Sequence, residues 1–105
     1  MSHIGYIPTH PGEVIKDELS ARGISQKDFA RHIGVPYTMF NDILNERRPL
    51  SAAIALLVES ALGISADLLV SLQTDYNLQK ARQDSAIKQR VRKIQPYHSA
   101  TSLSA

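Results

Sequence analysis

The sequence predicts an all-α protein, built from five helices and a helical C-terminal extension. Apolar residues recur at helical spacing in five consecutive segments, and each segment is bounded by a capping residue, a glycine or a proline. The alternation of apolar and polar residues that marks a strand is absent. At 105 residues the chain has room for about one domain. We therefore expect one helical domain over residues 8–78 and an extension over residues 79–105.

Composition narrows the class of protein further. The chain has no cysteine, which excludes disulfides and thiolate metal sites, and 43% of its residues are hydrophobic, as is typical of globular proteins. No apolar run approaches the roughly 20 residues that cross a bilayer, and the first residues lack the layout of a signal peptide. We expect a cytoplasmic protein with no membrane contact.

The charges are segregated along the chain. Residues 1–78 carry six basic and nine acidic side chains, a net charge of −3, whereas residues 79–105 carry six basic side chains against one acidic side chain, a net charge of +5. A basic appendage on an acidic body indicates contact with a polyanion or an acidic partner. A solubilising helix without a partner explains the same pattern, so both interpretations stay open.

The first helix is predicted from about Pro11 to Arg22. Thr9 and His10 precede this proline, which suits the first helical position, and Gly23 follows the segment as a stop. The apolar residues in between form one stripe, and most of the charged residues lie on the opposite side.

The second and third helices are short and are joined by a glycine turn. Ser25 is placed to cap the second helix, Ala30 is the small residue at which the two helices approach each other, and Gly34 forms the turn. The third helix is expected to bury one apolar stripe and to present hydrogen-bonding side chains outward. The buried stripe comprises Phe40, Ile43 and Leu44, and the outward residues are Tyr37, Thr38, Asn41, Asp42 and Asn45.

The fourth and fifth helices are predicted to follow Ser51 and Ser65, which are placed as caps. Gly63 ends the fourth helix, whereas no proline or glycine interrupts the fifth before Pro96, so the fifth is expected to be long. The residues of their apolar stripes are Ile54, Leu57, Val58, Ala61 and Leu62 in the fourth helix and Leu68, Leu69, Leu72 and Tyr76 in the fifth.

The basic extension contains a narrow apolar stripe of its own, formed by Ile87, Val91 and Ile94. Three roles are open for this segment: a fraying helix end, a contact with the phosphates of a polyanion, or packing against a partner protein. The residues past Pro96 are expected to form a loose terminus.

Two short helices joined by a tight glycine turn inside a helical bundle are typical of a helix-turn-helix DNA-binding domain. An α-helix fits the major groove, where short polar side chains can distinguish the base pairs. Asn41 suits adenine, Thr38 offers a hydroxyl and a methyl group for thymine, and Asp42 can accept from cytosine but would repel phosphates. Tyr37 completes the set of candidate base contacts. A merely solvated helix face is the alternative.

The block from Ser25 to Val35 resembles the lambdoid-repressor-like helix-turn-helix family, also called the XRE family, over roughly residues 12–70. The flanking residues 7–13 and 72–82 are similar to those of HigA-type antitoxins, the VapI-like addiction-module antidote proteins. Two departures stand out: Pro36 occupies the place of a Ser or Thr cap, and residues 46–48 replace a glycine-containing loop.

The resemblance implies a small protein that represses its own operon by binding double-stranded operator DNA and that neutralises a RelE-like, mRNA-cleaving toxin. It also implies contacts with the DNA phosphates, which position a protein without reading sequence. The residues in question are Gln26, Asn45, Arg47 and Arg48. A stand-alone XRE-family regulator without a toxin is the alternative, followed by a protein-binding helical module that has lost DNA binding.

One recognition helix makes too few contacts for selective binding, so we expect a homodimer on an inverted repeat. The fifth helix is the expected interface, with Leu69, Leu72 and Tyr76 as candidates. We expect no enzyme activity, no cofactor and no metal, because the four histidines lie far apart and no nucleophile or phosphate-loop motif is present.

Overall fold

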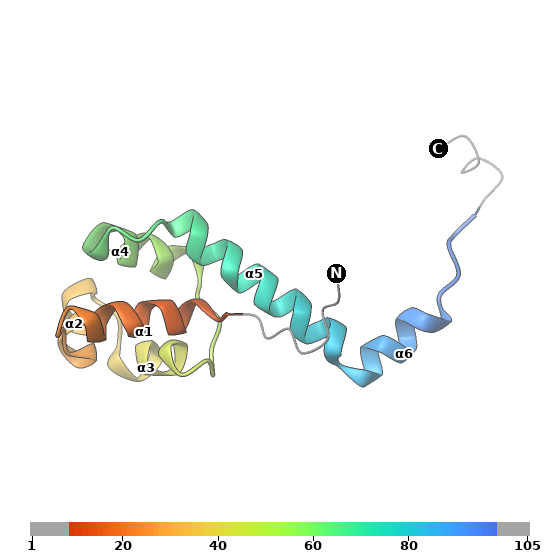
Figure 1. The fold of residues 1–105 in the computed structure, drawn as a ribbon, viewed down its shortest axis with the longest axis horizontal. Coiled ribbons are helices and arrows are strands. Elements are labelled where there is room, and N and C mark those ends of the chain that lie inside the picture. The colour runs from red at the N-terminus through yellow and green to blue at the C-terminus, as the bar shows by residue number, and fades with distance from the viewer. Residues whose placement is uncertain (1–8, 99–105) are drawn as a thin grey trace.

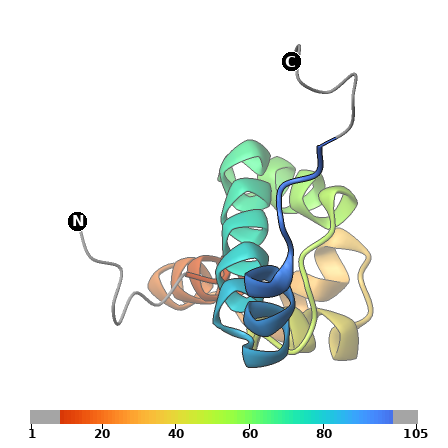
Figure 2. The same cartoon turned by 90° about the vertical axis from the view of Figure 1, so that its right-hand side faces the viewer.

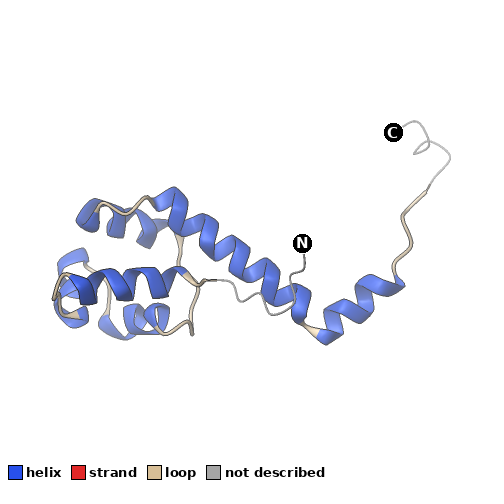
Figure 3. Ribbon diagram, in the orientation of Figure 1, coloured by secondary structure: helices blue, strands red, loops and turns tan. Residues whose placement is uncertain are grey.

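The computed structural model describes residues 9–98, which form six helices and no strand (Figures 1 and 3). The helices are α1 (Pro11–Ala21), α2 (Gln26–Ile33), α3 (Tyr37–Leu44), α4 (Ala52–Leu62), α5 (Ala66–Gln83) and α6 (Ser85–Lys93). The predicted all-α class is confirmed, with α6 lying in the extension. Residue 8, the expected start of the domain, and the terminus after residue 98 lie outside the described residues. Among the described residues, no helix is both long and apolar enough to cross a membrane.

Helices α1 to α4 and the first half of α5 pack around one apolar core, and the rest of α5 projects away from it (Figures 1 and 2). Burial of each large aliphatic or aromatic side chain stabilises the fold by about 1.5–3 kcal/mol. The largest fully buried side chains are Phe40, Ile15, Leu19, Ile43, Leu44, Leu69 and Val58. Three of the seven lie on α3, so this short helix is held in place through its inner face.

The start of α1 is packed against the end of α3. His10 is the N-cap of α1, and its Nδ1 accepts a hydrogen bond of 2.9 Å from the Gly12 N–H. A Cβ atom on Gly12 would collide with the Ile43 carbonyl oxygen, so only glycine allows this approach. The predicted start at Pro11 is confirmed, and the structure identifies His10 rather than Thr9 as the cap.

The turn between α2 and α3 has the predicted geometry. Ser25 Oγ accepts a hydrogen bond of 3.2 Å from the Asp28 N–H at the start of α2. Gly34 ends α2 with a φ of 75°, in the left-handed region that favours glycine. Ala30 is 1% exposed, which places the two helices in close contact, and the Val35 N–H donates to its carbonyl.

Helices α4 and α5 each expose one leucine that was expected in a buried apolar stripe. Ala55, Val58 and Leu62 face the core, whereas Leu57 is 41% exposed and Leu68 is 50% exposed. The prediction that these two leucines lie in the buried stripes is wrong, because the described helices that pack on α4 and α5 cover only their inner sides.

The expected long fifth helix is interrupted. Helix α5 ends at Gln83, and Asp84 takes an extended conformation with a ψ of 122°. Its Oδ1 accepts a hydrogen bond of 3.0 Å from the Ile87 N–H and so caps α6. The lack of glycine and proline between residues 66 and 95 did not predict an uninterrupted helix correctly. An aspartate side chain can accept a backbone N–H and so end one helix and begin the next. Figure 1 shows α6 turning away from the axis of α5.

Candidate nucleic-acid interface

Helix α3 presents a polar face away from the core. Phe40, Ile43 and Leu44 are buried, as predicted, and hold its other side against the bundle. Of the four candidate base contacts, Tyr37 is 41% exposed, Thr38 is exposed, and Asn41 and Asp42 are half-buried. The structure thus brings the four side chains to the accessible side of one helix.

The start of α3 has an additional feature that sequence reasoning did not use. Pro36 is the N-cap residue, and no side chain caps the helix by a hydrogen bond. The first backbone N–H groups of α3 therefore remain available to an acceptor from outside the chain. Helix N-termini attract anions through such N–H groups and through the helix dipole.

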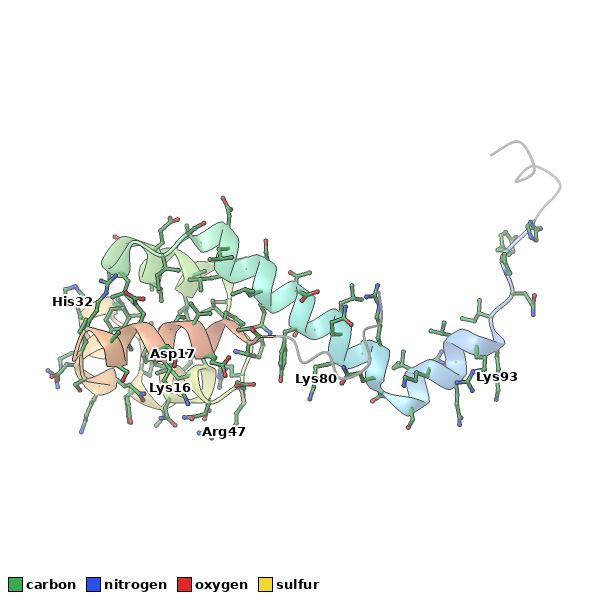
Figure 4. The ribbon with its side chains drawn as sticks, viewed as in Figure 1. Lys16, Asp17, His32, Arg47, Lys80 and Lys93 are labelled. Carbon is green, nitrogen blue, oxygen red and sulfur yellow. The ribbon has the colours of Figure 1, made fainter. Side chains whose placement is uncertain are left out.

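Three of the predicted contact residues form one hydrogen-bonded group. Arg47 Nε lies 3.1 Å from Asp42 Oδ1, in an ion pair whose two side chains are 59% and 37% exposed. Arg47 Nη2 donates to Asn41 Oδ1 at 2.9 Å. Figure 4 shows Arg47 at the solvent-facing edge of the loop that follows α3. The residue expected to contact phosphate is therefore bound to two residues expected to contact bases.

The remaining predicted phosphate contacts are spread around α3. Gln26 is the first residue of α2 and is half-buried, while Asn45 and Arg48 are exposed. Asn45 Nδ2 donates to the Asn41 carbonyl at 2.9 Å, and its Oδ1 accepts from Lys16 Nζ at 3.3 Å. Helical spacing predicts that Lys16, like most charged residues of α1, lies on the solvated side, but the structure turns it toward the end of α3 (Figure 4). Its position one turn after Gly12 could have indicated this contact.

The loop after α3 is fixed from the side of α1 and α5. Leu50 N–H donates a hydrogen bond of 2.7 Å to Oε1 of Gln73, a buried residue of α5. His10 is 2% exposed, and its ring meets Tyr76 edge-on with centroids 4.8 Å apart. Sequence reasoning missed Gln73, whose burial inside a helix of polar sequence leaves no trace in the residue pattern.

The protonation state of His10 follows from its contacts. Because Nδ1 accepts from the Gly12 N–H, this nitrogen carries no proton in the folded chain. Burial lowers the pKa of His10, while the charge of Glu46 and a hydrogen bond with the Arg48 backbone oppose the shift. A neutral His10 therefore links the start of α1 to the loop that carries the arginines.

The candidate dimer residues occupy different environments. Leu69 is fully buried in the core of its own chain, so it has no surface to offer a second chain, and its assignment to an interface is withdrawn. Leu72 and Tyr76 are half-buried, and Tyr76 packs between His10 and Lys80, whose Nζ lies 5.8 Å from the ring centroid. Further along α5, Leu78 is 47% exposed and offers an accessible apolar side chain.

Comparison with known proteins places this geometry in a family. Residues 15–69 match the helix-turn-helix family. Virulence-associated protein I of Dichelobacter nodosus is 34% identical over 76 residues, which cover 71% of this chain and 70% of that protein.

Two solved structures of antitoxins are also similar over most of this chain. The antitoxin HigA of Pseudomonas aeruginosa, solved with the higBA promoter, is 35% identical with a TM-score of 0.77, covering 87% of this chain and 99% of that one. A HigA-family addiction module antidote protein from Coxiella burnetii is 30% identical with a TM-score of 0.74, covering 86% and 98%.

The chain belongs to the helix-turn-helix family. Within this family it is similar to HigA-type antitoxins and to a VapI-like protein, as its flanking residues predicted. The two solved relatives are an antitoxin and an addiction module antidote protein, which agrees with the expected class.

Proposed function

We propose that this protein is the DNA-binding antitoxin of a toxin–antitoxin module, which represses its own operon as a homodimer and neutralises a RelE-like, mRNA-cleaving toxin. The observation that carries the proposal is the outward polar face of α3, held by three buried residues beside a fixed loop with two arginines. The likeness to a HigA antitoxin solved with promoter DNA supports the same conclusion.

The residues divide into two roles on DNA. Thr38 and Asn41 lie on the outer side of α3, where they would meet base edges in the major groove. Arg48, exposed in the loop after α3, and Lys16, which is bound to Asn45 at the end of α3, would contact the flanking phosphates, together with Gln26 and the uncapped start of α3.

A second copy of the chain would pack on the distal part of α5 and on α6. The end of α5 and α6 line an open hollow of about 590 Å³, whose apolar lining is formed by Leu78, Ala81, Ile87 and Val91 and which three basic side chains complete. No residue of α6 is buried within its own chain. Covering such aliphatic side chains contributes about 1.5–3 kcal/mol each, which favours a two-fold pair through this surface. The two recognition helices of such a pair would then meet half-sites about 10 base pairs apart.

The toxin partner rests on the similarity to antitoxins. The exposed acidic side chains of α1, Glu13 and Asp17, offer a surface for a basic toxin, and a simply solvated face is the alternative. The reading frame next to this gene is the place to look for the toxin. Co-expression of that frame with this protein should restore growth that the frame alone arrests.

The DNA-binding function is tested by titrating the protein against its own promoter and against a scrambled duplex of the same composition. We expect selective binding to the promoter, and we expect Asn41→Ala to cost about 1–3 kcal/mol on the promoter and little on scrambled DNA. Selective binding without a toxin next to the gene would identify a stand-alone regulator. Failure to bind either duplex would identify a protein-binding module.

A further inference from the structure

Arg47 is placed by the way in which α3 ends. The Arg47 N–H donates to the Asp42 carbonyl at 2.8 Å, and the Glu46 N–H donates to the Ile43 carbonyl at 3.1 Å. Glu46 lies in the left-handed region with a φ of 64°. This pair of bonds around a left-handed residue is a Schellman motif. It folds the chain back, so that Arg47 lies alongside the last turns of α3.

The side chain of Arg47 then reaches both polar residues in the middle of α3. Nε donates to Asp42 Oδ1 at 3.1 Å and Nη2 donates to Asn41 Oδ1 at 2.9 Å. A guanidinium presents several N–H groups in a rigid fork and can hold two acceptors at once, whereas a lysine ammonium on a flexible stem lacks that geometry. Arg48, by contrast, has no side-chain hydrogen bond or ion pair within residues 9–98.

These contacts have two consequences for a DNA complex. Arg47 occupies one lone pair of Asn41 Oδ1 and so fixes which end of the amide is the acceptor, while the second lone pair and the Nδ2 donor stay available for adenine. Arg47 also places a positive charge on Asp42, whose carboxylate would otherwise repel the neighbouring phosphates.

We propose that Arg47 is a positioning residue for sequence readout, which orients Asn41 and compensates the charge of Asp42, and that it is not a phosphate contact. The inference rests on the proposed binding of DNA by α3. It reverses the role that the resemblance implied for Arg47 and leaves phosphate contact to Arg48 and Lys16.

The experiment first selects a preferred duplex with the wild-type protein from a randomised pool, and then measures affinity for this duplex and a scrambled one over a range of salt concentrations. The variants are Arg47→Lys and Arg47→Ala, with Arg48→Lys as the matched control and Asn41→Ala as the background for a double-mutant cycle. Circular dichroism checks that each variant is folded.

If the proposal holds, Arg47→Lys lowers the affinity for the selected duplex about 5- to 10-fold and leaves the affinity for scrambled DNA unchanged. The reason is that lysine keeps the positive charge but cannot hold two acceptors as the guanidinium does. Replacing the adenine that Asn41 contacts then lowers the affinity of Arg47→Lys by a smaller factor than it lowers the affinity of the wild-type protein. In the Asn41→Ala background the same substitution changes the affinity ratio less than about twofold, because its target is gone. Arg48→Lys leaves the ratio unchanged.

Two results would overturn the inference, and they differ in whether the proposed DNA-binding function survives. If Arg47→Lys retains full selectivity and Arg47→Ala weakens both duplexes alike, with a salt slope shallower by about 0.9, Arg47 is a phosphate contact and the DNA-binding function stands. If the wild-type protein selects no sequence from the pool, the proposed function fails and the role of Arg47 fails with it.

Discussion

Gln73 on α5 accepts a hydrogen bond of 2.7 Å from the backbone N–H of Leu50, at the end of the loop that follows α3. Both residues are buried, Gln73 with 6% and Leu50 with 5% of its surface exposed. The amide nitrogen of Gln73 donates in turn to Asn77 Oδ1 at 2.9 Å. The bond ties the arginine-bearing loop to the helix that leads to the proposed dimer surface.

Replacing Gln73 by leucine should destabilise the protein by about 1–3 kcal/mol, because the buried Leu50 N–H loses its acceptor. Thermal unfolding would show a melting temperature lower by about 4–8 °C for each kcal/mol. Asn77→Ala is the control, since it removes the second bond and keeps the first. Equal losses for the two variants would contradict the importance of the Leu50 contact.

Gly12→Ala should also destabilise the protein, by about 1–3 kcal/mol, because the new Cβ would meet the Ile43 carbonyl at the end of α3. Alanine favours a helix over glycine by about 1 kcal/mol, so a loss of stability must come from the collision. Ser20→Ala, at an exposed position of the same helix, serves as the control in urea unfolding. A more stable Gly12→Ala variant would contradict this expectation, because it would show that the Ile43 carbonyl can move away from the new Cβ at no cost.

Glu46→Gly should stabilise the protein by about 1 kcal/mol, because Glu46 is a non-glycine residue with a φ of 64°. Glu46→Ala removes the same charge and keeps the strained backbone, so it should bring no comparable gain. Differential scanning calorimetry compares the three proteins. A gain shared by both variants would assign the effect to charge instead of backbone strain.

Stability should fall as the pH decreases below about 6.5, the ordinary pKa of histidine, because the pKa of His10 is lowered in the folded chain. Between the two pKa values, His10 binds a proton in the unfolded chain but not in the folded chain. The loss of stability levels off once the pH is below the folded-state pKa. His10→Asn keeps an oxygen to accept from the Gly12 N–H and does not titrate. Urea unfolding at pH 7.5 and 5.5 should show a larger loss for the wild type than for this variant, and equal losses would refute the assignment.

Val91→Asp should weaken the dimer and leave the unfolding of a single chain almost unchanged, because Val91 is 64% exposed and no residue of α6 is buried in its own chain. Sedimentation velocity measures the dimer, and Gln89→Asp adds the same charge at a polar position of α6 as the control. A dimer unaffected by Val91→Asp would show that the interface lies elsewhere on the chain.

A phosphate contact by the extension would be indicated instead if Lys93→Ala gave a salt slope of DNA binding shallower by about 0.9.

The sequence by itself determined the parts of the fold that depend on neighbouring residues. Ser25, Ser51 and Ser65 each accept a hydrogen bond from the N–H group three residues later, as predicted, because a cap involves only one turn of chain. The turn at Gly34 and the buried stripe of α3 follow from residue type and helical spacing in the same way. The outward position of the four candidate base contacts on α3 was predictable for this reason.

Only the tertiary structure decided which helix faces are covered and which polar groups meet. Spacing shows that apolar residues share a face, but it cannot show whether another helix lies over that face, so Leu57 is exposed and Leu69 is buried. The contacts of Gln73 with Leu50 and of Lys16 with Asn45 join residues 23 and 29 positions apart. The contacts of the Arg47 guanidinium with Asn41 and Asp42 depend on the left-handed backbone of Glu46, a conformation that its residue type disfavours.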